Sequence, residues 1–548
     1  MKGLLILGRW LYEGRGIFSI YSGLAAFAMW LNGGREWPEA LIVFQYVCGT
    51  ALAFLVAWTA LRFTGRRGVA LTAGLAAALY APELMYESVT LRESIMAFVC
   101  TLSLALVITL RRRHFAGWRM ILAGAILTLP CLVRVSAGIW TATGMLWVWW
   151  YICRKQRYGV KKDWLKIIYK GALIGLGAFI ILVPSWTWNY FSQGYPLPFY
   201  LNIGYSIKVG MVDNAKTMNV EMKTEASRAD NKSCPTSSGK HSVENDCKVV
   251  CPFVKYGKKV VEVFLPFEKA NNLNFYFLRA KFTILNYLLR PEILLSLAVV
   301  MFIWWLVDGS VFKKESLLFI YLIAMTISMC VFLPLARYRL VLLPVLCIAG
   351  GMMMTGKLYS MLRKKSLWKF VIIMSVLVAY CWLTWPRTVP LRSEDFVAWG
   401  IAKKSRGDMP LSYLNDFANA YKLKPDSISA AFNFAGALLQ TGKYETAAGV
   451  SLKTLQSHPD NQGLKLNASS ALMACRNPKA AERILRSIRE PSDPVGYYYN
   501  LGECLRLQDR RGEALNAYKS ALASAVTDSQ KRLLKKKITR LTLNLKIK

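Results

Sequence analysis

The segment YAPELMYESVTLRES, residues 80–94, places three glutamates, Glu83, Glu87 and Glu93, and one arginine, Arg92, between two long apolar runs. Carboxylates at the mouth of a membrane helix meet both water and lipid, and partial desolvation raises their pKa toward values useful for general acid–base catalysis. Carboxylates also bind hard divalent metal ions. The structural alternative is that Glu83 and Glu87 are interfacial solubilising groups, while Glu93 begins a helix whose dipole favours negative charge.

Three arginines stand at the ends of other apolar runs: Arg134 in LVRVSAG, and Arg337 and Arg339 in LARYRLVLLPVL. A guanidinium can bind a phosphate through two parallel hydrogen bonds, which suits the water–lipid boundary. Any one such arginine is also explained by a side chain that reaches from the bilayer to water. Acids and arginines that converge on one face predict a site for a phosphate-bearing lipid substrate.

Apolar helices must position these residues. The chain has 548 residues, of which 54% are hydrophobic, and a mean hydropathy of +0.30, as multi-span membrane proteins have. Recurrent apolar runs of about 17–25 residues are long enough to cross the hydrocarbon. They lie near 40–62, 69–86, 93–110, 117–133, 137–153, 167–188, 290–309, 316–334, 341–359 and 367–386. A weaker run at 17–33 is an eleventh span or an interfacial helix.

The formal net charge of +38 would suit a nucleic-acid partner, but its distribution argues against one. Lysines and arginines gather at every second connection between the apolar runs, which is the positive-inside pattern of membrane proteins. The clusters are 62–67, 111–119, 154–166, 313–314 and 357–369. The pattern predicts that they lie in the cytoplasm and that the acidic segment, Arg134, Arg337 and the loop 189–289 lie outside it.

The chain divides into five parts: an N-terminal interfacial or first-span segment (1–36), a transmembrane block (37–190), an extracytoplasmic loop (191–289), a second transmembrane block (290–386) and a helical domain (387–548). The loop holds Cys234, Cys247 and Cys251, which predict one disulfide and one free thiol in an oxidising compartment. A zinc site that adds His241 has poor ligand spacing. With ten or eleven spans, the alternation places the helical domain outside the cytoplasm.

The helical domain contains a repeat. Its clearest copy matches the tetratricopeptide spacing W-x2-LG-x2-Y-x8-A-x3-F-x2-A at Tyr498, Leu501, Gly502, Leu505, Ala514, Tyr518 and Ala521. A second copy matches at Phe432, Ala435, Gly436, Leu439, Ala448 and Leu452, and residues 466–487 form a shortened copy. Small residues let antiparallel helices approach, so the pattern predicts an α-solenoid that serves as a docking surface for a protein partner.

Taken together, these motifs resemble the GT-C superfamily of integral-membrane glycosyltransferases, in its bacterial protein-mannosyltransferase-like and aminoarabinose-transferase-like branch. The acidic segment resembles the family's paired spans, with the acid that opens the second falling on Glu93. GAILTLPCLVRVSAG places Arg134, LVPSWTWNYFSQGYPLP resembles the segment before the large external loop, and ARYRLVLLPVLCIAG places Arg337 and Arg339. The resemblance implies an all-α polytopic bundle of about 10–11 spans in the bacterial inner membrane.

The resemblance further implies transfer of a sugar from a polyprenyl-phosphate donor to a glycan, lipid or protein acceptor on the extracytoplasmic face. Arg337, Arg339 and Arg134 would bind the lipid phosphate, and Glu93 would orient substrate at the same mouth. No cofactor is expected with certainty, although a divalent metal ion would fit the chemistry. Inverting transfer needs a base for the acceptor hydroxyl and compensation of charge on the leaving phosphate.

The family's essential acid, usually an aspartate, stands in a first external loop that RWLYEGRGIFSIYSG resembles only at its tail. Glu13 is the nearest carboxylate. Three explanations remain open: the start codon is set too late, Glu13 or Glu83 substitutes, or the protein is a non-catalytic relative. Two other functions therefore stand beside the transferase, an envelope assembly scaffold that uses the repeat domain and an oligosaccharide polymerase or ligase.

Overall fold

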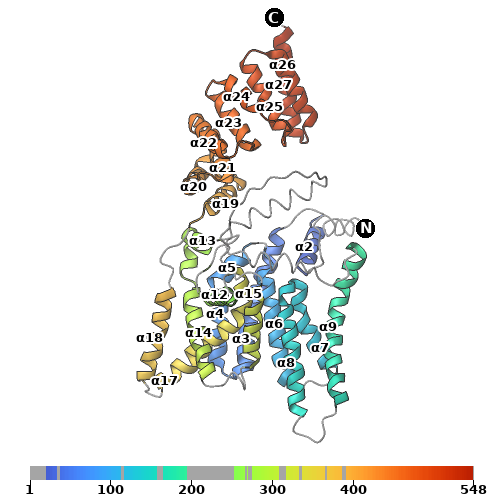
Figure 1. Ribbon diagram of the computed structural model, residues 1–548, viewed down its shortest axis with the longest axis vertical. Helices are drawn as coiled ribbons and strands as arrows, with labels where there is room; N and C mark the ends of the chain where they lie inside the picture. Colours follow the sequence, from blue (N-terminus) through green and yellow to red (C-terminus); the bar gives the residue numbers. More distant parts are fainter. Residues whose placement is uncertain are drawn as a thin grey trace. The chain divides into compact units, whose positions relative to one another are not determined.

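The computed structural model divides into two compact units, Met1–Arg387 (unit 1) and Thr388–Lys548 (unit 2). It describes residues 20–33, 38–89, 91–112, 117–156, 164–193, 252–265, 268, 274–307, 316–331, 336–363, 367–384 and 391–546. Over these residues the protein is helical, with one isolated β-bridge and no strand (Figure 1). The predicted all-α class is confirmed for the described residues. Glu13, Cys234, Cys247, Cys251 and His241 lie outside them.

Unit 1 is built from apolar helices. In chain order they are α2 (Ile20–Leu31), α3 (Pro38–Thr64), α4 (Arg67–Ala78), α5 (Ala81–Glu87), α6 (Glu93–Arg112), α7 (Trp118–Val133), η1 (Val135–Ala137), α8 (Gly138–Gln156), α9 (Trp164–Gln193), α12 (Pro252–Phe264), α13 (Phe275–Lys281), η2 (Thr283–Asn286), α14 (Pro291–Val307), α15 (Ser316–Val331), η4 (Ala336–Leu342), α16 (Leu343–Gly351), η5 (Met352–Leu358), α17 (Tyr359–Arg363) and α18 (Leu367–Thr384).

Five helical stretches in the described residues are long and apolar enough to cross a membrane: Glu39–Thr64, Glu93–Arg111, Ile167–Phe191, Arg337–Arg363 and Leu367–Thr384. Others, such as Trp118–Val133 and Pro291–Val307, are apolar but shorter. The structure therefore supports a membrane protein, and the figure of ten or eleven spans remains a prediction.

The predicted single span over 69–86 is wrong, because the chain breaks between α4 and α5. Tyr80 has extended backbone angles (φ −71°, ψ 107°), and Pro82 stands in the first turn of α5, where its missing N–H costs nothing. The break is held by a parallel β-bridge to Leu289: Ala81 N–H donates to Leu289 O at 3.0 Å, and Leu289 N–H donates to Leu79 O at 2.8 Å. Hydropathy alone does not reveal this break, because the residue that pairs with it, Leu289, lies far along the chain, just before α14.

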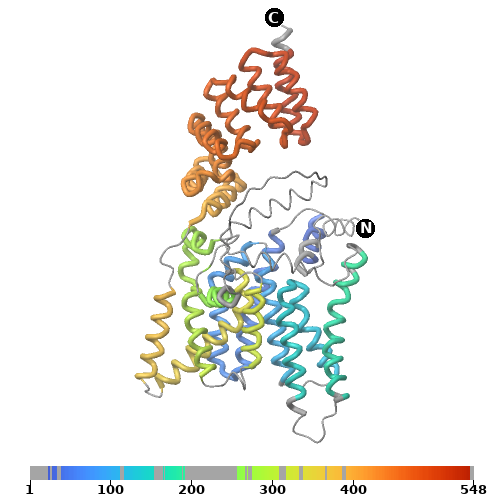
Figure 2. The backbone as a smooth tube through the Cα atoms, in the orientation of Figure 1, coloured from blue at the N-terminus to red at the C-terminus, as the bar shows by residue number. Residues whose placement is uncertain are grey.

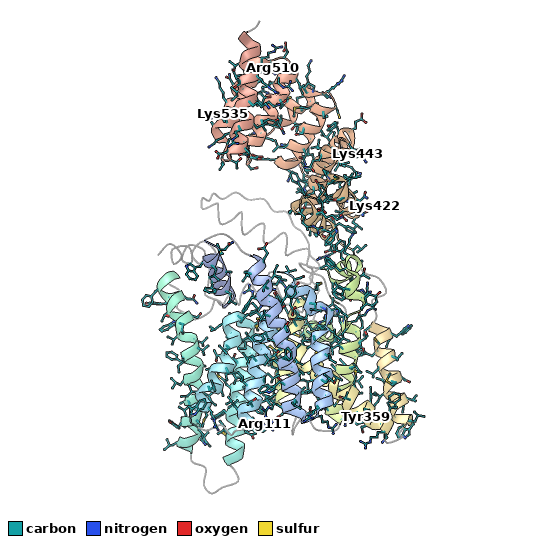
Figure 3. The ribbon with its side chains drawn as sticks, turned by 180° about the vertical axis from the view of Figure 1, so that it is seen from behind. Arg111, Tyr359, Lys422, Lys443, Arg510 and Lys535 are labelled. Carbon is teal, nitrogen blue, oxygen red and sulfur yellow. The ribbon has the colours of Figure 1, made fainter. Side chains whose placement is uncertain are left out.

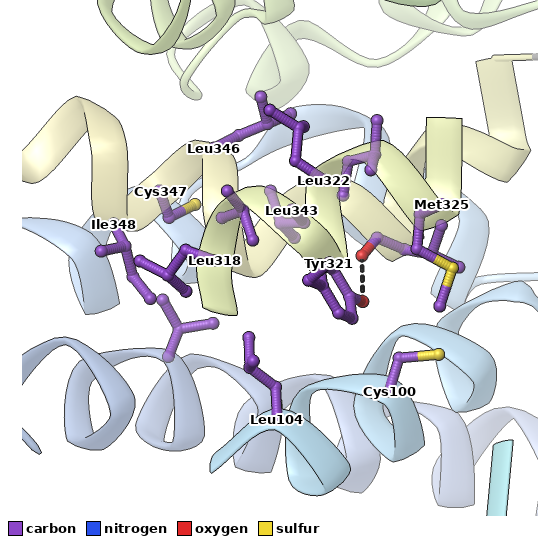
Figure 4. Close-up of a cluster of buried hydrophobic side chains, with 14 of the residues drawn as sticks. Cys100, Leu104, Leu318, Tyr321, Leu322, Met325, Leu343, Leu346, Cys347 and Ile348 are labelled. Atoms are coloured by element: carbon purple, nitrogen blue, oxygen red, sulfur yellow. Dashed lines mark hydrogen bonds between the residues drawn. The ribbon is translucent and has the colours of Figure 1, made fainter. Parts of the chain in front are cut away.

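The core of unit 1 joins helices that are distant in sequence. Trp140 of α8 is fully buried, donates to Ser103 Oγ of α6 at 2.9 Å and packs edge-on against Tyr321 of α15, with ring centroids 4.8 Å apart. The Tyr321 hydroxyl donates to Val341 O at 2.6 Å, which ties α15 to η4. Figure 4 shows Tyr321 among Cys100, Met325 and Leu343. These contacts fix η4, which carries Arg337.

The two ends of unit 1 differ in character. Glu93 opens α6 and Arg111 lies near its other end, so the axial rise of this helix separates them by about 30 Å. Arg111 and Tyr359 lie at the same end of the unit in Figure 3. The basic end of α6 and the start of α17 therefore share one end of unit 1, and Glu93 lies at the opposite one.

Unit 2 is a series of helices, each packed against the next (Figure 2): α19 (Ser393–Ser405), α20 (Pro410–Leu423), α21 (Ile428–Gln440), α22 (Tyr444–Ser457), α23 (Gln462–Ala474), α24 (Pro478–Arg486), α25 (Pro494–Leu507), α26 (Arg511–Ser524) and α27 (Asp528–Lys546). It has its own apolar clusters, one around Phe417 and Ala435, another around Tyr518 and Leu534. The residues of the predicted repeats fall on the pairs α21–α22 and α25–α26. Their assignment as tetratricopeptide repeats remains a prediction.

Gly502 generates a prediction for unit 2, because a Cβ atom built at this position would lie 2.7 Å from Cε1 of the buried Tyr518 ring. We expect Gly502→Ala to lower the free energy of unfolding of unit 2 by about 1–3 kcal/mol, since the helices α25 and α26 must separate to admit the methyl group. Urea denaturation followed by circular dichroism measures the change.

Gly436 is the matched control, because it holds the corresponding place on α21 and a Cβ atom there would meet nothing within 4 Å. Gly436→Ala should leave stability unchanged or raise it by up to about 1 kcal/mol, the ordinary gain in helix propensity. Equal effects of the two substitutions would contradict the packing explanation.

Candidate functional site

Three of the predicted residues meet in one place. Glu93 Oε1 lies 3.6 Å from Arg134 Nη1 and 3.4 Å from Arg337 Nε. The Glu93 side chain is 7% exposed, whereas those of Arg134 and Arg337 are 26% and 15% exposed. The structure thus brings together a carboxylate and two guanidinium groups from three separate elements. It does not bring Arg339 or Glu83 to them.

The local backbone explains how each side chain arrives. Glu93 is the first residue of α6, where the helix dipole favours a carboxylate. Arg134 lies between α7 and η1 in an extended conformation (φ −156°, ψ 129°). Its side chain therefore does not continue the spiral of side chains on α7. Arg337 lies in the 3₁₀ helix η4, which leads into the buried helix α16.

Tyr338 completes the cluster, and the sequence reasoning did not single it out. The Arg134 guanidinium carbon lies 3.8 Å from the centre of its ring, and that of Arg337 lies 4.9 Å away. Arg337 Nη2 donates to the Tyr338 hydroxyl at 3.0 Å. Cations over an aromatic ring are attracted by its quadrupole, so Tyr338 holds two like charges near each other. The available signal was its place between two arginines in ARYRL.

A small cleft opens beside these groups. Its lining is Glu93, Met96, Arg134, Ser136, Met325, Ser328, Met329, Arg337, Tyr338 and Val341. Its volume is about 30 Å³, room for about two water molecules. Ser328 Oγ donates to Ser136 O at 2.7 Å and so joins α15 to η1 at the polar wall. The other wall is apolar and rich in methionine.

Two polar atoms at the cleft have no hydrogen-bond partner among the described residues: Glu93 Oε2 and Arg337 Nε. Both are buried, and a buried polar atom without a partner costs free energy. Glu93 Oε2 is thus an acceptor, and Arg337 Nε a donor beside Glu93 Oε1, whose hydrogen bonds the described residues do not supply. The three charges of the cleft sum to one positive charge, which favours an anion.

Arg339 lies in different surroundings. Its side chain is 4% exposed, Nη1 donates to Leu265 O at 2.5 Å, and Nη2 lies 3.8 Å from Glu268 Oε1. A 3₁₀ helix has about three residues per turn, so side chains two positions apart point to different sides. Arg337 thus faces the cleft, while Arg339 fastens the segment that follows α12.

Glu83 and Glu87 form a second buried acidic site, and the interpretation of both as interfacial solubilising groups is wrong. They are 2% and 3% exposed, and neither Glu83 oxygen has a hydrogen-bond partner among the described residues. Gln45 Nε2 of α3 donates to Glu87 O at 3.1 Å and to Val89 O at 2.7 Å, which fixes the end of α5. The Glu87 carboxylate lies against Gly49, where any Cβ atom would overlap it.

Burial governs the protonation of these two groups, which lie on α5 outside the helices that are long enough to span a membrane. Burial, and then the charge of Glu87, raise the pKa of Glu83 to about 8. Burial raises the pKa of Glu87 to about 7. A carboxyl group that stays protonated near neutral pH can exist in apolar surroundings without a counter-ion.

The described residues contain no group of three His, Cys, Asp or Glu side chains placed to hold a metal ion. Glu93 is the one carboxylate in the lining of the cleft, with two arginines beside it. The cleft as described is thus suited to an anion. Glu13 and the cysteine cluster of the loop are outside the described residues.

No protein-family model and no curated protein matches this sequence. The fold and the cleft define a class only: a helical protein with helices fit to span a membrane and a cationic cleft lined by residues of α6, α15, η1 and η4. The similarity to the GT-C superfamily remains a prediction from the sequence motifs.

The buried acid pair predicts a pH dependence of stability. Because the pKa of Glu83 in the folded state, about 8, exceeds its ordinary value of 4.5, the folded protein binds this proton more tightly. Stability from this group is therefore complete at acid pH and is lost as the pH rises toward 8. We expect Glu83→Gln to flatten the fall in Tm, measured in detergent between about pH 5 and pH 9.

Glu39→Gln serves as the control, because Glu39 is exposed at the start of α3. This variant should follow the unaltered protein at every pH. A Glu83→Gln profile parallel to that of the unaltered protein would show that Glu83 takes no part.

Proposed function

We propose that this chain is an integral-membrane glycosyltransferase that moves a sugar from a polyprenyl-phosphate donor to an envelope acceptor. It would act on the extracytoplasmic face of a bacterial inner membrane, with the large loop and unit 2 on that side. The observation that carries the proposal is the meeting of Glu93, Arg134 and Arg337 in one cleft. Orientation rests on the positive-inside pattern of the basic connections.

Donor binding follows from the charges of the cleft. Two guanidiniums and one carboxylate leave one net positive charge, and arginine suits phosphate through paired N–H donors. Arg337 Nε lies 3.4 Å from Glu93 Oε1 and makes no hydrogen bond among the described residues, so a shift of this side chain would let it donate to a phosphate oxygen. The same contacts would stabilise the charge that develops on the leaving phosphate.

Transfer requires an acceptor oxygen to bond to the anomeric carbon while the bond from that carbon to the phosphate oxygen breaks. The acceptor hydroxyl proton must pass to a base, and the polyprenyl phosphate leaves with the bonding electrons. Glu93 Oε1 contacts both arginines, whereas its buried Oε2 has no hydrogen-bond partner in the described residues. We assign Glu93 Oε2 as the acceptor of the hydroxyl hydrogen bond and of this proton.

The size of the cleft sets a further requirement. About 30 Å³ does not hold a sugar phosphate, so the lining must move when substrate enters. Met96, Met325 and Met329 form the wall that can do so, because methionine is unbranched and adapts to different shapes. The acceptor, whether glycan, lipid or protein, would approach from the aqueous side.

Arg337 provides the direct test. We expect Arg337→Ala to reduce glycan transfer by at least about 100-fold, because a donor to the phosphate is lost, while the protein stays folded. Envelope glycoconjugates are compared in strains that lack the gene and carry either version. Binding of polyprenyl phosphate to the purified protein in detergent should weaken in parallel.

Arg67→Ala is the control, because Arg67 is exposed at the start of α4 and is absent from the lining of the cleft. It should keep most of the activity. If Arg337→Ala transfers sugar normally, Arg337 has no place in the site. If the glycans respond only to removal of unit 2, the assembly-scaffold function is favoured.

The two acidic environments give a second test. Glu93→Gln should impair transfer by about 100-fold or more, since glutamine cannot take the proton. Glu87→Gln should have a mild effect, because Glu87 is outside the lining of the cleft. The measurement is the initial rate of sugar transfer from a synthetic polyprenyl-phosphate sugar. If the two variants lose activity equally and mildly, Glu93 takes no part in the chemistry.

A further inference from the structure

The final helix of unit 2, α27, has an unusual charge distribution. Of its 19 residues, Asp528–Lys546, seven are Lys or Arg and one, Asp528, is acidic. Its inner face is apolar: Leu534 and Leu541 are buried in the cluster that includes Tyr518. The helix α27 therefore carries a high positive charge, while its apolar side packs against the rest of unit 2.

The exposed cations occupy one face of α27. They are Lys531, Arg532, Lys535, Lys536 and Arg540. At 3.6 residues per turn this spacing forms a continuous stripe on the side opposite Leu534 and Leu541. Lys535 is labelled in Figure 3. We call these five residues the α27 basic face.

Other cations of unit 2 are used differently. Lys537, in the same helix, lies 2.5 Å from Glu503 and over the ring of Tyr499, so it is part of the fold. Arg510 pairs with Glu482 and Glu513. Within residues 391–546 no ion pair involves a member of the α27 basic face.

This arrangement costs stability without an external partner. Side chains four residues apart are neighbours on a helix, so Lys531 repels Lys535 and Arg532 repels Lys536. Solvated helix faces more commonly alternate the two signs of charge. A face of a single sign suits an extended anionic surface that neutralises several of its charges at once.

We propose that the α27 basic face binds the anionic phospholipid headgroups of a membrane surface. Each Lys or Arg of such a cluster on an amphipathic helix is attracted by the negative surface potential of an anionic bilayer. Leu533, 49% exposed beside the stripe, can enter the headgroup layer. This inference does not depend on the proposed glycosyltransferase activity.

Chain connectivity favours a membrane over another polyanion. The stretch Leu367–Thr384 is apolar enough to span a bilayer, and α19 of unit 2 begins at Ser393. Unit 2 is therefore tethered close to lipid, which raises the effective concentration of headgroups around it. Nucleic-acid recognition commonly adds aromatic side chains for base stacking, and residues 528–546 contain none.

The test uses the full chain in nanodiscs of neutral phosphatidylcholine, presented to immobilised vesicles that contain about 30% phosphatidylglycerol. The variant changes Lys531, Arg532, Lys535 and Lys536 to glutamine. We expect its affinity for the vesicles to fall at least about tenfold, because four headgroup contacts are lost. Binding by the unaltered protein should weaken as salt rises.

A matched control changes four exposed lysines elsewhere in unit 2, Lys422, Lys443, Lys453 and Lys479, to glutamine. It carries the same net charge as the first variant and should bind as the unaltered protein does. If both variants lose affinity for the vesicles equally, the effect comes from net charge and not from the α27 basic face, and the proposal is overturned. Loss of affinity for a short RNA with vesicle binding intact would also overturn it, in favour of a nucleic-acid surface.

Discussion

The cleft depends on one interaction, the contact of the Glu93 carboxylate with the guanidiniums of Arg134 and Arg337. Charges that leave water need partners, and removing one partner of a buried set is costly. This requirement aligns the start of α6, the link from α7 to η1, and the 3₁₀ helix η4. Trp140, Tyr321 and Ser328 hold the same elements through uncharged contacts. The charged groups are thus held in place by a packed scaffold.

One short segment supplies two acidic environments with opposite chemistry. Glu93 faces two cations and keeps one oxygen without a hydrogen bond in the described residues. Glu83, ten residues earlier, is buried beside Glu87, and its pKa is raised to about 8. The two environments differ because the chain breaks between α4 and α5. Glu83 and Glu87 on α5 are buried, whereas Glu93 begins α6 at the cleft. Carboxylates that look equivalent in sequence therefore differ in surroundings: Glu93 is ion-paired with two arginines, whereas burial raises the pKa of Glu83 and Glu87.

Cationic residues also serve several purposes in this chain. Arg337 and Arg134 line the cleft, Arg339 fastens a buried segment to Glu268, and Lys537 joins α27 to Glu503. Arg111, near the end of α6, lies at the same end of unit 1 as Tyr359, where α17 begins (Figure 3). The positive charge of the chain is thus distributed over helix ends, contacts between buried segments and the lining of the cleft.

Much of the local structure was predictable from the sequence. The runs at 40–62, 93–110 and 117–133 correspond to α3, α6 and α7, because a long apolar run without a break is a strong local signal for a helix. Other features required partners far along the chain. The β-bridge to Leu289 accompanies the break of residues 69–86 into two helices, and the 3₁₀ geometry of η4 separates Arg337 from Arg339. The packing of two arginines on the ring of Tyr338 likewise depends on residues from distant segments. Sequence determined which residues could carry charge to a helix end; the tertiary structure decided which of them meet, because the partners of a buried charge are set by packing between distant segments.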